Sequence, residues 1–453
     1  MSTTQKNTGG HANTKLWVRM YRVGFGDCFL VAVPTKKGPR FILIDCGEHS
    51  SHIGSLPAVV DDIATVTDSH LSLVIATHRH ADHLRGFYKC AARFRAFTVD
   101  AVWMSCWDNP DDKQAVALQA HLLAQAEAFE QQVRPLAATD DVARAALGLT
   151  GLLTGRGLAA AATGPDDSDL SNNAAALAML RGAPEDPVYC FKNSPVRHYY
   201  RGGDKAALPT ELAVAGLGVK ILGPPTDPGL LSDMDAKAQY LRLVAESAHP
   251  APLKPFDSDW RTSQYPPDAL HPFQARQLEQ LIRAVQPDTL LAGAALADNT
   301  INNQSLVVLF TFAGKTLLFT GDAQWGNWEN FLYGQDVSKM TAPQLLPASK
   351  KMLAALDLYK VGHHGSTNAT PMAAVGALRK GAVALCSTEP GCFGSVAKNS
   401  EVPRGPLLAE LAKKGPVVRS DQVAAGEAKA NATVKLPPHF SSPGNQLYID
   451  YEF

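Results

Sequence analysis

A short cluster of histidines constrains this chain more than any other feature of its sequence. His78, His80, Asp82 and His83 stand within six residues of one another, directly after the apolar run 71–76. That run has the length and composition of a buried strand. In an extended loop His78 and His80 point to the same side, because side-chain direction repeats every two residues. Asp82 and His83 turn to another side, so one loop can supply ligands to two neighbouring metal ions.

Two later segments can complete such a site. Asp322 follows the apolar run 316–320 after a glycine, and His363 and His364 follow the run 358–361. We predict that Asp322 bridges the two metals and that His364 completes the second metal's shell, since the glycine after it leaves room. His363 then either contacts the substrate and protonates a leaving group, or is purely structural.

The ligand types indicate which metals fit. Imidazole nitrogens and carboxylate oxygens suit Zn²⁺, Mn²⁺ and iron. The sequence therefore predicts two divalent metal ions as cofactors, with zinc as the first choice. The predicted reaction is hydrolysis by a hydroxide held between the two metals, because bound cations lower the pKa of water towards 7. Asp82, itself a ligand, can also orient this hydroxide and is a candidate catalytic residue.

Composition places the chain among ordinary globular proteins. Of its 453 residues, 45% are hydrophobic and 19% are charged, and the formal net charge of −1 offers no general attraction to nucleic acid or to an anionic membrane. The seven cysteines are odd in number, scattered and without a Cys-x-x-Cys pair, which argues against a disulfide framework. Without an apolar run of about 20 residues, we predict a cytoplasmic protein that does not enter the membrane.

The chain divides into segments of different character. Residues 1–14 are predicted to form a flexible tail, and 15–453 one hydrolase domain. Residues 107–290 are predicted to be a largely helical insertion that caps the site. Within this insertion, residues 197–205 mix basic and aromatic side chains, including Arg197 and Arg201, in a predicted loop. This loop either contacts a phosphate or a base, or is simply solvated.

The order of these motifs resembles that of the metallo-β-lactamase superfamily. The finer resemblance is to the branch related to the hydrolase domain of ComEC-type competence proteins, in residues 23–27, 43–47, 303–307 and 360–366. It implies an α/β fold of the αββα type, in which two mixed sheets lie between helices. Within the matching segments, Asn303 and Ser366 are candidates for contact with the ligands or the substrate. Asp45 either orients a ligand histidine through its ring N–H or caps a turn.

Two features depart from the family pattern. The superfamily has a third histidine on the first metal, but this chain has only Asp298, Asn299, Asn302 and Asn303 in that neighbourhood. An Asn or Asp side chain or water takes the position, or the first metal is held weakly. The membrane portion of the competence proteins is also missing, so DNA translocation is not implied.

The resemblance favours a phosphodiester as the substrate, in a nucleic acid, a nucleotide or a phospholipid-like molecule. A pair of metals also suits in-line displacement at phosphorus. The alternative enzyme activity is hydrolysis of a lactone, an amide or a thioester. A third hypothesis is a catalytically weak metal-binding scaffold that serves in partner recognition. Measured turnover separates these three hypotheses, whereas metal content does not.

Overall fold

The computed structural model describes most of the chain. The described residues are 14–49, 53–135, 137, 143–144, 146–147, 150, 172–182, 188–233, 297–337, 340, 343–393, 401–422, 436–443 and 447–453. Nearly all of the predicted tail and much of the predicted insertion, including residues 151–171 and 234–290, lie outside them.

The first sheet has eight strands in the order β13-β14-β1-β2-β3-β4-β5-β6. The strands β3, β4, β5 and β6 run parallel to one another, and the remaining neighbours pair antiparallel. The bounds are β1 Trp17–Tyr21, β2 Cys28–Val33, β3 Arg40–Cys46, β4 His70–Ala76, β5 Thr98–Ser105, β6 Val196–Tyr200, β13 Phe440–Ser441 and β14 Tyr448–Glu452. The four parallel strands therefore end at one edge of the sheet.

The second sheet has six strands in the order β12-β11-β10-β9-β8-β7. Here β9, β10, β11 and β12 run parallel, while β7 and β8 are antiparallel to their neighbours. The bounds are β7 Gly218–Gly223, β8 Val307–Phe312, β9 Lys315–Phe319, β10 Leu358–Lys360, β11 Val383–Cys386 and β12 Val417–Arg419. Both sheets are thus mixed.

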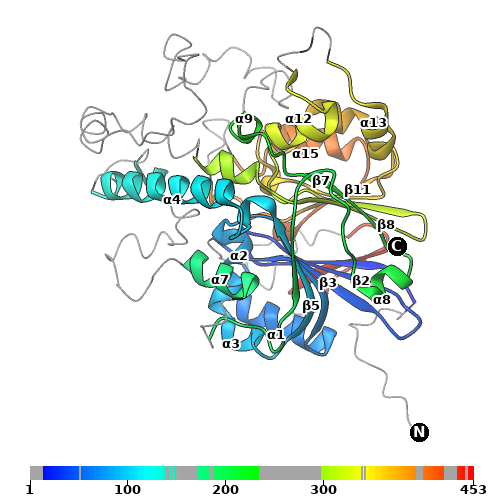
Figure 1. Ribbon diagram of the computed structural model, residues 1–453. Coiled ribbons are helices and arrows are strands. Elements are labelled where there is room, and N and C mark those ends of the chain that lie inside the picture. Colours follow the sequence, from blue (N-terminus) through cyan, green and yellow to red (C-terminus); the bar gives the residue numbers. More distant parts are fainter. Residues whose placement is uncertain are drawn as a thin grey trace, which may run out of the picture.

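The sheets pack face to face with helices on their outer faces (Figure 1). Apolar side chains of both sheets meet between them, as in the Phe29–Phe319 ring contact with centroids 5.8 Å apart. The helices α1 Leu56–Thr67, α2 Ala81–Lys89, α3 Ala91–Phe94 and α7 Asn172–Arg181 cover the first sheet. The helices α12 Trp325–Tyr333, α13 Pro347–Leu353, α14 Met372–Ala377 and α15 Gly405–Ala412 cover the second. The predicted αββα class is confirmed.

The layered arrangement explains why the central strands have no polar alternation. Every residue of β2 is buried, and β4 is buried from its second residue onward. A strand covered on both faces has no solvated side, so apolar residues are favoured at every position. The continuous apolar run before the histidine cluster therefore marks a central strand.

The region 107–290 contributes to both sheets. Its described helices are α4 Lys113–Val133, which projects from the body in Figure 1, together with α7, α8 Thr210–Val214 and α9 Pro228–Leu231. It also contains β6 and β7, which form one edge of each sheet. The prediction of a loop at 197–205 is wrong for its first part, because Val196–Tyr200 forms strand β6 and pairs with β5. Valine and tyrosine favour strands, and the exposed edge of β5 offers them unpaired backbone groups.

Short helical turns complete the described elements. They are η1 Cys106–Asp108, η6 His363–Gly365 and η8 Ser420–Gln422. Within the described residues, none of the helices has both the length and the apolar character needed to cross a bilayer.

Candidate metal centre

Asp45, at the end of β3, holds the loop that follows β4. The backbone N–H of Thr77 donates to Asp45 Oδ1 at 2.8 Å, and the Thr77 hydroxyl donates to Oδ2 at 2.7 Å. Asp45 Oδ2 also lies 2.8 Å from His83 Nδ1. Asp45 has a left-handed backbone with φ of 55°, which costs about 1–2 kcal/mol for a residue with a Cβ. Such conformations concentrate at functional sites, and here the conformation places one carboxylate against both the loop and a histidine.

Four side chains from three segments converge near the ends of parallel strands from both sheets. Asp82 and His83 lie in the first turn of α2, and not in the extended loop that the sequence predicted, while His364 lies in η6. His364 Nε2 lies 3.0 Å from Asp82 Oδ2, and Asp322 Oδ2 lies 3.1 Å from His83 Nε2 and 3.3 Å from His364 Nε2. All four residues are buried, and their ligand atoms lie within 4.8 Å of one another. The structure thus brings together Asp82 and His83 with Asp322 and with His364, which is 282 positions from Asp82.

The donor set fits a divalent metal ion. Two imidazole nitrogens and two carboxylate oxygens are the ligand types that zinc, manganese and iron accept. Asp82 Oδ1 is a buried atom with no hydrogen-bond partner among the described residues, and His83 Nε2 makes no well-aligned hydrogen bond although Asp322 Oδ2 lies 3.1 Å away. Buried polar atoms are rarely left unpaired in native proteins, so a ligand at this point would satisfy them.

The electrostatic interactions within the cluster also favour a divalent metal ion. Burial works to raise the pKa of Asp82 and of Asp322, but His83 and His364 outweigh it, so that both pKa values lie below their usual range. Burial works to lower the pKa of His364, but the neighbouring carboxylates raise it to about 10. Without metal, protonated histidines thus neutralise the carboxylates. A divalent cation can take over this role.

His78 and His80 form a second pair of nitrogens beside the cluster. His78 Nε2 lies 3.1 Å from His80 Nδ1, and both residues are 1% exposed. His78 Nδ1 lies 3.3 Å from the Ser305 hydroxyl and 3.1 Å from that of Thr77. Two imidazole nitrogens that face each other at this separation can chelate one ion, since zinc–nitrogen bonds are about 2.0–2.1 Å long.

Asp322 is held by groups that the sequence did not single out. Its Oδ1 accepts the backbone N–H of His363 at 3.1 Å and lies 3.4 Å from Lys360 Nζ. Lys360 also forms a buried ion pair with Asp27. Gly321 precedes Asp322 with φ of 52°, and a Cβ there would come within 2.8 Å of the Thr77 side chain. The glycine therefore permits the close approach that the sequence predicts.

We expect Lys360→Met to destabilise the protein measurably. Lys360 is buried at 1% exposure between Asp27 and Asp322. Its loss leaves two carboxylates without their cation, and breaking a buried pair costs about 3 kcal/mol or more. Urea denaturation of the metal-free protein measures the change in the free energy of unfolding. The control Lys413→Met removes an exposed pair with Glu410 and should cost no more than about 1 kcal/mol. Equal losses for the two variants would contradict this assignment.

His363 lies outside the cluster and is partly exposed. The Gln324 side-chain amide donates to its Nδ1 at 3.1 Å, and the Ser366 hydroxyl lies 2.8 Å from the same atom. Asn302 Nδ2 lies 3.4 Å from its Nε2. Ser366 thus contacts His363 and not the cluster.

Asn303 binds backbone groups instead of the site. Its Oδ1 accepts the N–H of Gln324 and of Asn327, each at 3.1 Å, and its Nδ2 donates to the carbonyl of Leu231 at 2.9 Å. It therefore fixes the start of α12 against the end of α9.

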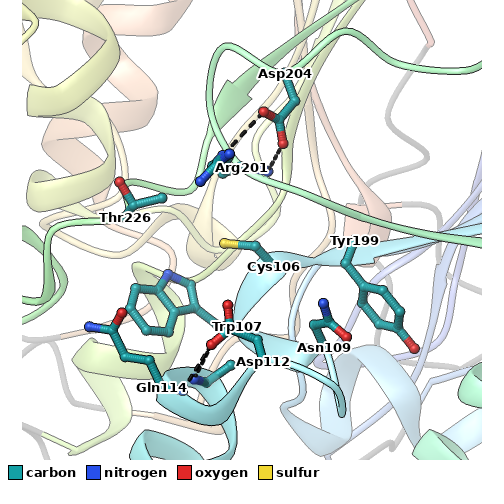
Figure 2. Close-up of a pocket in the computed structure, with 10 residues that line it drawn as sticks. Cys106, Trp107, Asn109, Asp112, Gln114, Tyr199, Arg201, Asp204 and Thr226 are labelled. Atoms are coloured by element: carbon teal, nitrogen blue, oxygen red, sulfur yellow. Dashed lines mark hydrogen bonds and ion pairs between the residues drawn. The ribbon is translucent and has the colours of Figure 1, made fainter.

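A cavity of about 300 Å³ lies next to the metal loop along the same sheet edge. Figure 2 shows Trp107, Tyr199 and Arg201 among the residues that line it, with Arg201 paired to Asp204. The turn η1 supplies Cys106 and Trp107 to the lining of the cavity. Asp108 of the same turn accepts a hydrogen bond of 2.6 Å from the guanidinium of Arg79, which stands between His78 and His80 in the sequence. The Asp108–Arg79 contact therefore connects the turn that lines the cavity with the segment that carries His78 and His80.

The two arginines predicted as substrate candidates have different surroundings. Arg201 lines the cavity, whereas the guanidinium of Arg197 donates to the carbonyls of Leu180 and Pro195 at 2.9 and 3.0 Å. Arg197 lies within β6, whereas Arg201 follows the end of this strand.

Three residues near the site were missed as site residues by the sequence reasoning. Lys360 and Asp27 form the buried ion pair beside Asp322, and Asp298 lies 3.7 Å from His80 Nε2 through its Oδ1. A lysine inside the apolar strand β10 is a signal that could have been used, because unpaired charges are rarely buried. The sequence indicated Asp298 only as one possible substitute for the missing histidine.

Comparisons with known proteins find similarity to solved structures. No protein-family model matches the chain, and no curated protein matches it. Among solved structures, a metallo-beta-lactamase fold protein, YhfI from Bacillus subtilis, is similar over 89% of this chain and 95% of its own, at 10% identity and a TM-score of 0.33. The site described above rests on this chain's own strand order and side-chain geometry.

Proposed function

We propose that this chain is a metal-dependent phosphodiesterase of the metallo-β-lactamase superfamily, in the branch that resembles ComEC-type hydrolase domains. The observation that carries the proposal is the buried group of Asp82, His83, Asp322 and His364 beside the facing nitrogens of His78 and His80. Two divalent metals, with zinc first, would be held by these six residues. When bound, such ions supply an activated water and polarise the scissile bond.

The chain's own residues would position the substrate and move a proton. Asp82 has one carboxylate oxygen 3.0 Å from His364 Nε2 and a second without a hydrogen-bond partner among the described residues, so it can orient the attacking water. His363, which is partly exposed beside the cluster, would contact the substrate or protonate a leaving oxygen. Arg201, in the neighbouring cavity, would attract the negative charge of a phosphodiester. The substrate would be a nucleic acid, a nucleotide or a phospholipid-like molecule.

The proposed setting is the cytoplasm. Cys28, Cys46, Cys90 and Cys386 are buried thiols that form no disulfide. Reduced thiols are typical of cytosolic proteins. No membrane partner is proposed.

A substrate panel tests the activity. Purified protein is loaded with Zn²⁺ or Mn²⁺ and offered bis(p-nitrophenyl) phosphate, single- and double-stranded DNA and RNA, a lactone, a thioester and a β-lactam. Metal-dependent cleavage of a phosphodiester, abolished by a chelator, is the expected result. Cleavage of the lactone or the thioester alone would replace this proposal with the carboxyl-ester activity. Metal binding without any turnover would favour the scaffold.

We expect Arg201→Ala to weaken binding of an anionic substrate. Losing one charge-assisted hydrogen bond costs about 1.5–3 kcal/mol, so KM for a phosphodiester should rise by roughly tenfold or more. The matched control is Arg197→Ala, four residues earlier, whose guanidinium binds backbone carbonyls and whose loss should leave KM unchanged. Steady-state kinetics on the phosphodiester and on a neutral ester measure both effects. An equal rise in KM for the neutral ester would show that Arg201 does not recognise charge.

A further inference from the structure

The two ring nitrogens of His80 have different surroundings. Its Nδ1 faces His78 Nε2 at 3.1 Å, as two ligands of one ion would. Its Nε2 is buried on the other side of the ring and has no hydrogen-bond partner among the described residues. Asp298 Oδ1 faces this nitrogen at 3.7 Å, and it too is buried without a hydrogen-bond partner there. A donor and an acceptor thus lie opposite each other, slightly beyond hydrogen-bonding distance.

We propose that Asp298 positions His80 for metal binding. If Nδ1 binds a metal, the neutral ring must carry its proton on Nε2, where the Asp298 carboxylate can accept it. Metal-binding histidines usually donate their second ring N–H to a carboxylate or a carbonyl, which fixes the tautomer and the ring orientation. A small closure of the 3.7 Å gap would also satisfy two buried polar atoms, each costing about 1–3 kcal/mol when unpaired. The inference rests on the proposed metal site.

The neighbouring residues hold Asp298 in the required orientation. Asn302, four positions later in the same helical segment, donates to Asp298 Oδ2 at 3.0 Å. That bond occupies one carboxylate oxygen and leaves Oδ1 to face His80. Asp298 and Asn302 are 4% and 0% exposed, so water does not compete freely for the contact.

The position of Asp298 suggests how the first metal could be held without a third histidine. The position that a histidine would occupy in the resembling family falls in the segment with Asp298 and Asn302. In this chain Asp298 would strengthen the binding of the first metal by His80, because it accepts the proton of the ring nitrogen that does not bind the metal. The second metal would depend on Asp82, His83, Asp322 and His364, which Asp298 does not support. The inference therefore predicts a defect confined to one of the two metals.

The test measures zinc binding and not activity. Asp298→Ala, Asp298→Asn and the parent are titrated with Zn²⁺ against a chromophoric chelator, and bound zinc is counted by elemental analysis. Loss of a supporting carboxylate lowers metal affinity by about 10–100-fold. We expect this loss for one of two zinc ions in Asp298→Ala, and a smaller loss in Asp298→Asn, whose amide oxygen can still accept the proton. The control Asp227→Asn, at the exposed cap of α9, should bind zinc like the parent.

A second readout separates positioning from a purely structural role. In zinc-loaded protein labelled with ¹⁵N-histidine, the Nε2–H of His80 should give a protected resonance that Asp298→Ala removes or shifts. Asp298→Asn keeps the shape of the side chain and carries the test if the alanine variant does not fold.

Three results would overturn the inference. They are unchanged affinity at both sites, equal loss at both sites, and a parent that binds a single zinc ion. A parent that binds no zinc would instead remove the proposed metal site, whereas failure of the substrate panel alone leaves the inference standing.

Discussion

Replacing Asp322 with alanine is expected to abolish turnover while the protein stays folded. Asp322 Oδ2 lies 3.1 Å from His83 Nε2 and 3.3 Å from His364 Nε2, at the centre of the ligand cluster. Its loss removes the carboxylate placed to serve both metals. We expect activity to fall by at least about 10⁴-fold, which corresponds to about 5.4 kcal/mol of transition-state stabilisation. Steady-state kinetics on the best phosphodiester of the panel measure this change.

The control for this variant is Asp357→Ala. Asp357 also lies on a loop beside a strand of the second sheet, where its carboxylate binds the backbone of Thr316 and the side chain of Arg379. It has no contact with the cluster, so its loss should leave the rate constant within a few-fold of the parent. Thermal unfolding of the metal-free variants confirms that both are folded. Activity within a few-fold of the parent in Asp322→Ala would show that Asp322 is only a turn residue.

The sequence predicted the local elements of the site well because their signals are local. The apolar run 71–76 corresponds to β4 His70–Ala76, and the apolar run 316–320 before Asp322 corresponds to β9 Lys315–Phe319. A buried strand needs apolar residues at successive positions, and a turn needs glycine where φ is positive. Both requirements can be read from a few neighbouring residues.

Contacts between distant segments were not predicted for the opposite reason. Lys360 binds Asp27 across 333 positions, and Asp298 faces His80 from the helical segment that precedes β8. Neither contact leaves a pattern in the neighbouring residues, since each depends on how the two sheets stack. The misread strand β6 shows a related limit. Its basic and aromatic residues resemble a binding loop in composition, whereas pairing with β5 decides its conformation.

The double variant His78→Ala/His80→Ala is expected to lose the first metal. His78 Nε2 and His80 Nδ1 are the facing nitrogens of that site. A four-ligand zinc site contributes roughly 10–16 kcal/mol, so the loss of two ligands costs on the order of 5–8 kcal/mol. Elemental analysis after dialysis should show about one metal fewer per chain than in the parent. The matched control is His70→Ala/His121→Ala, because His70 pairs with Asp100 outside the site and His121 lies on an exposed face of α4. Unchanged metal content in a folded His78/His80 variant would contradict the assignment of the whole loop, because the loop would then hold its histidines for packing alone.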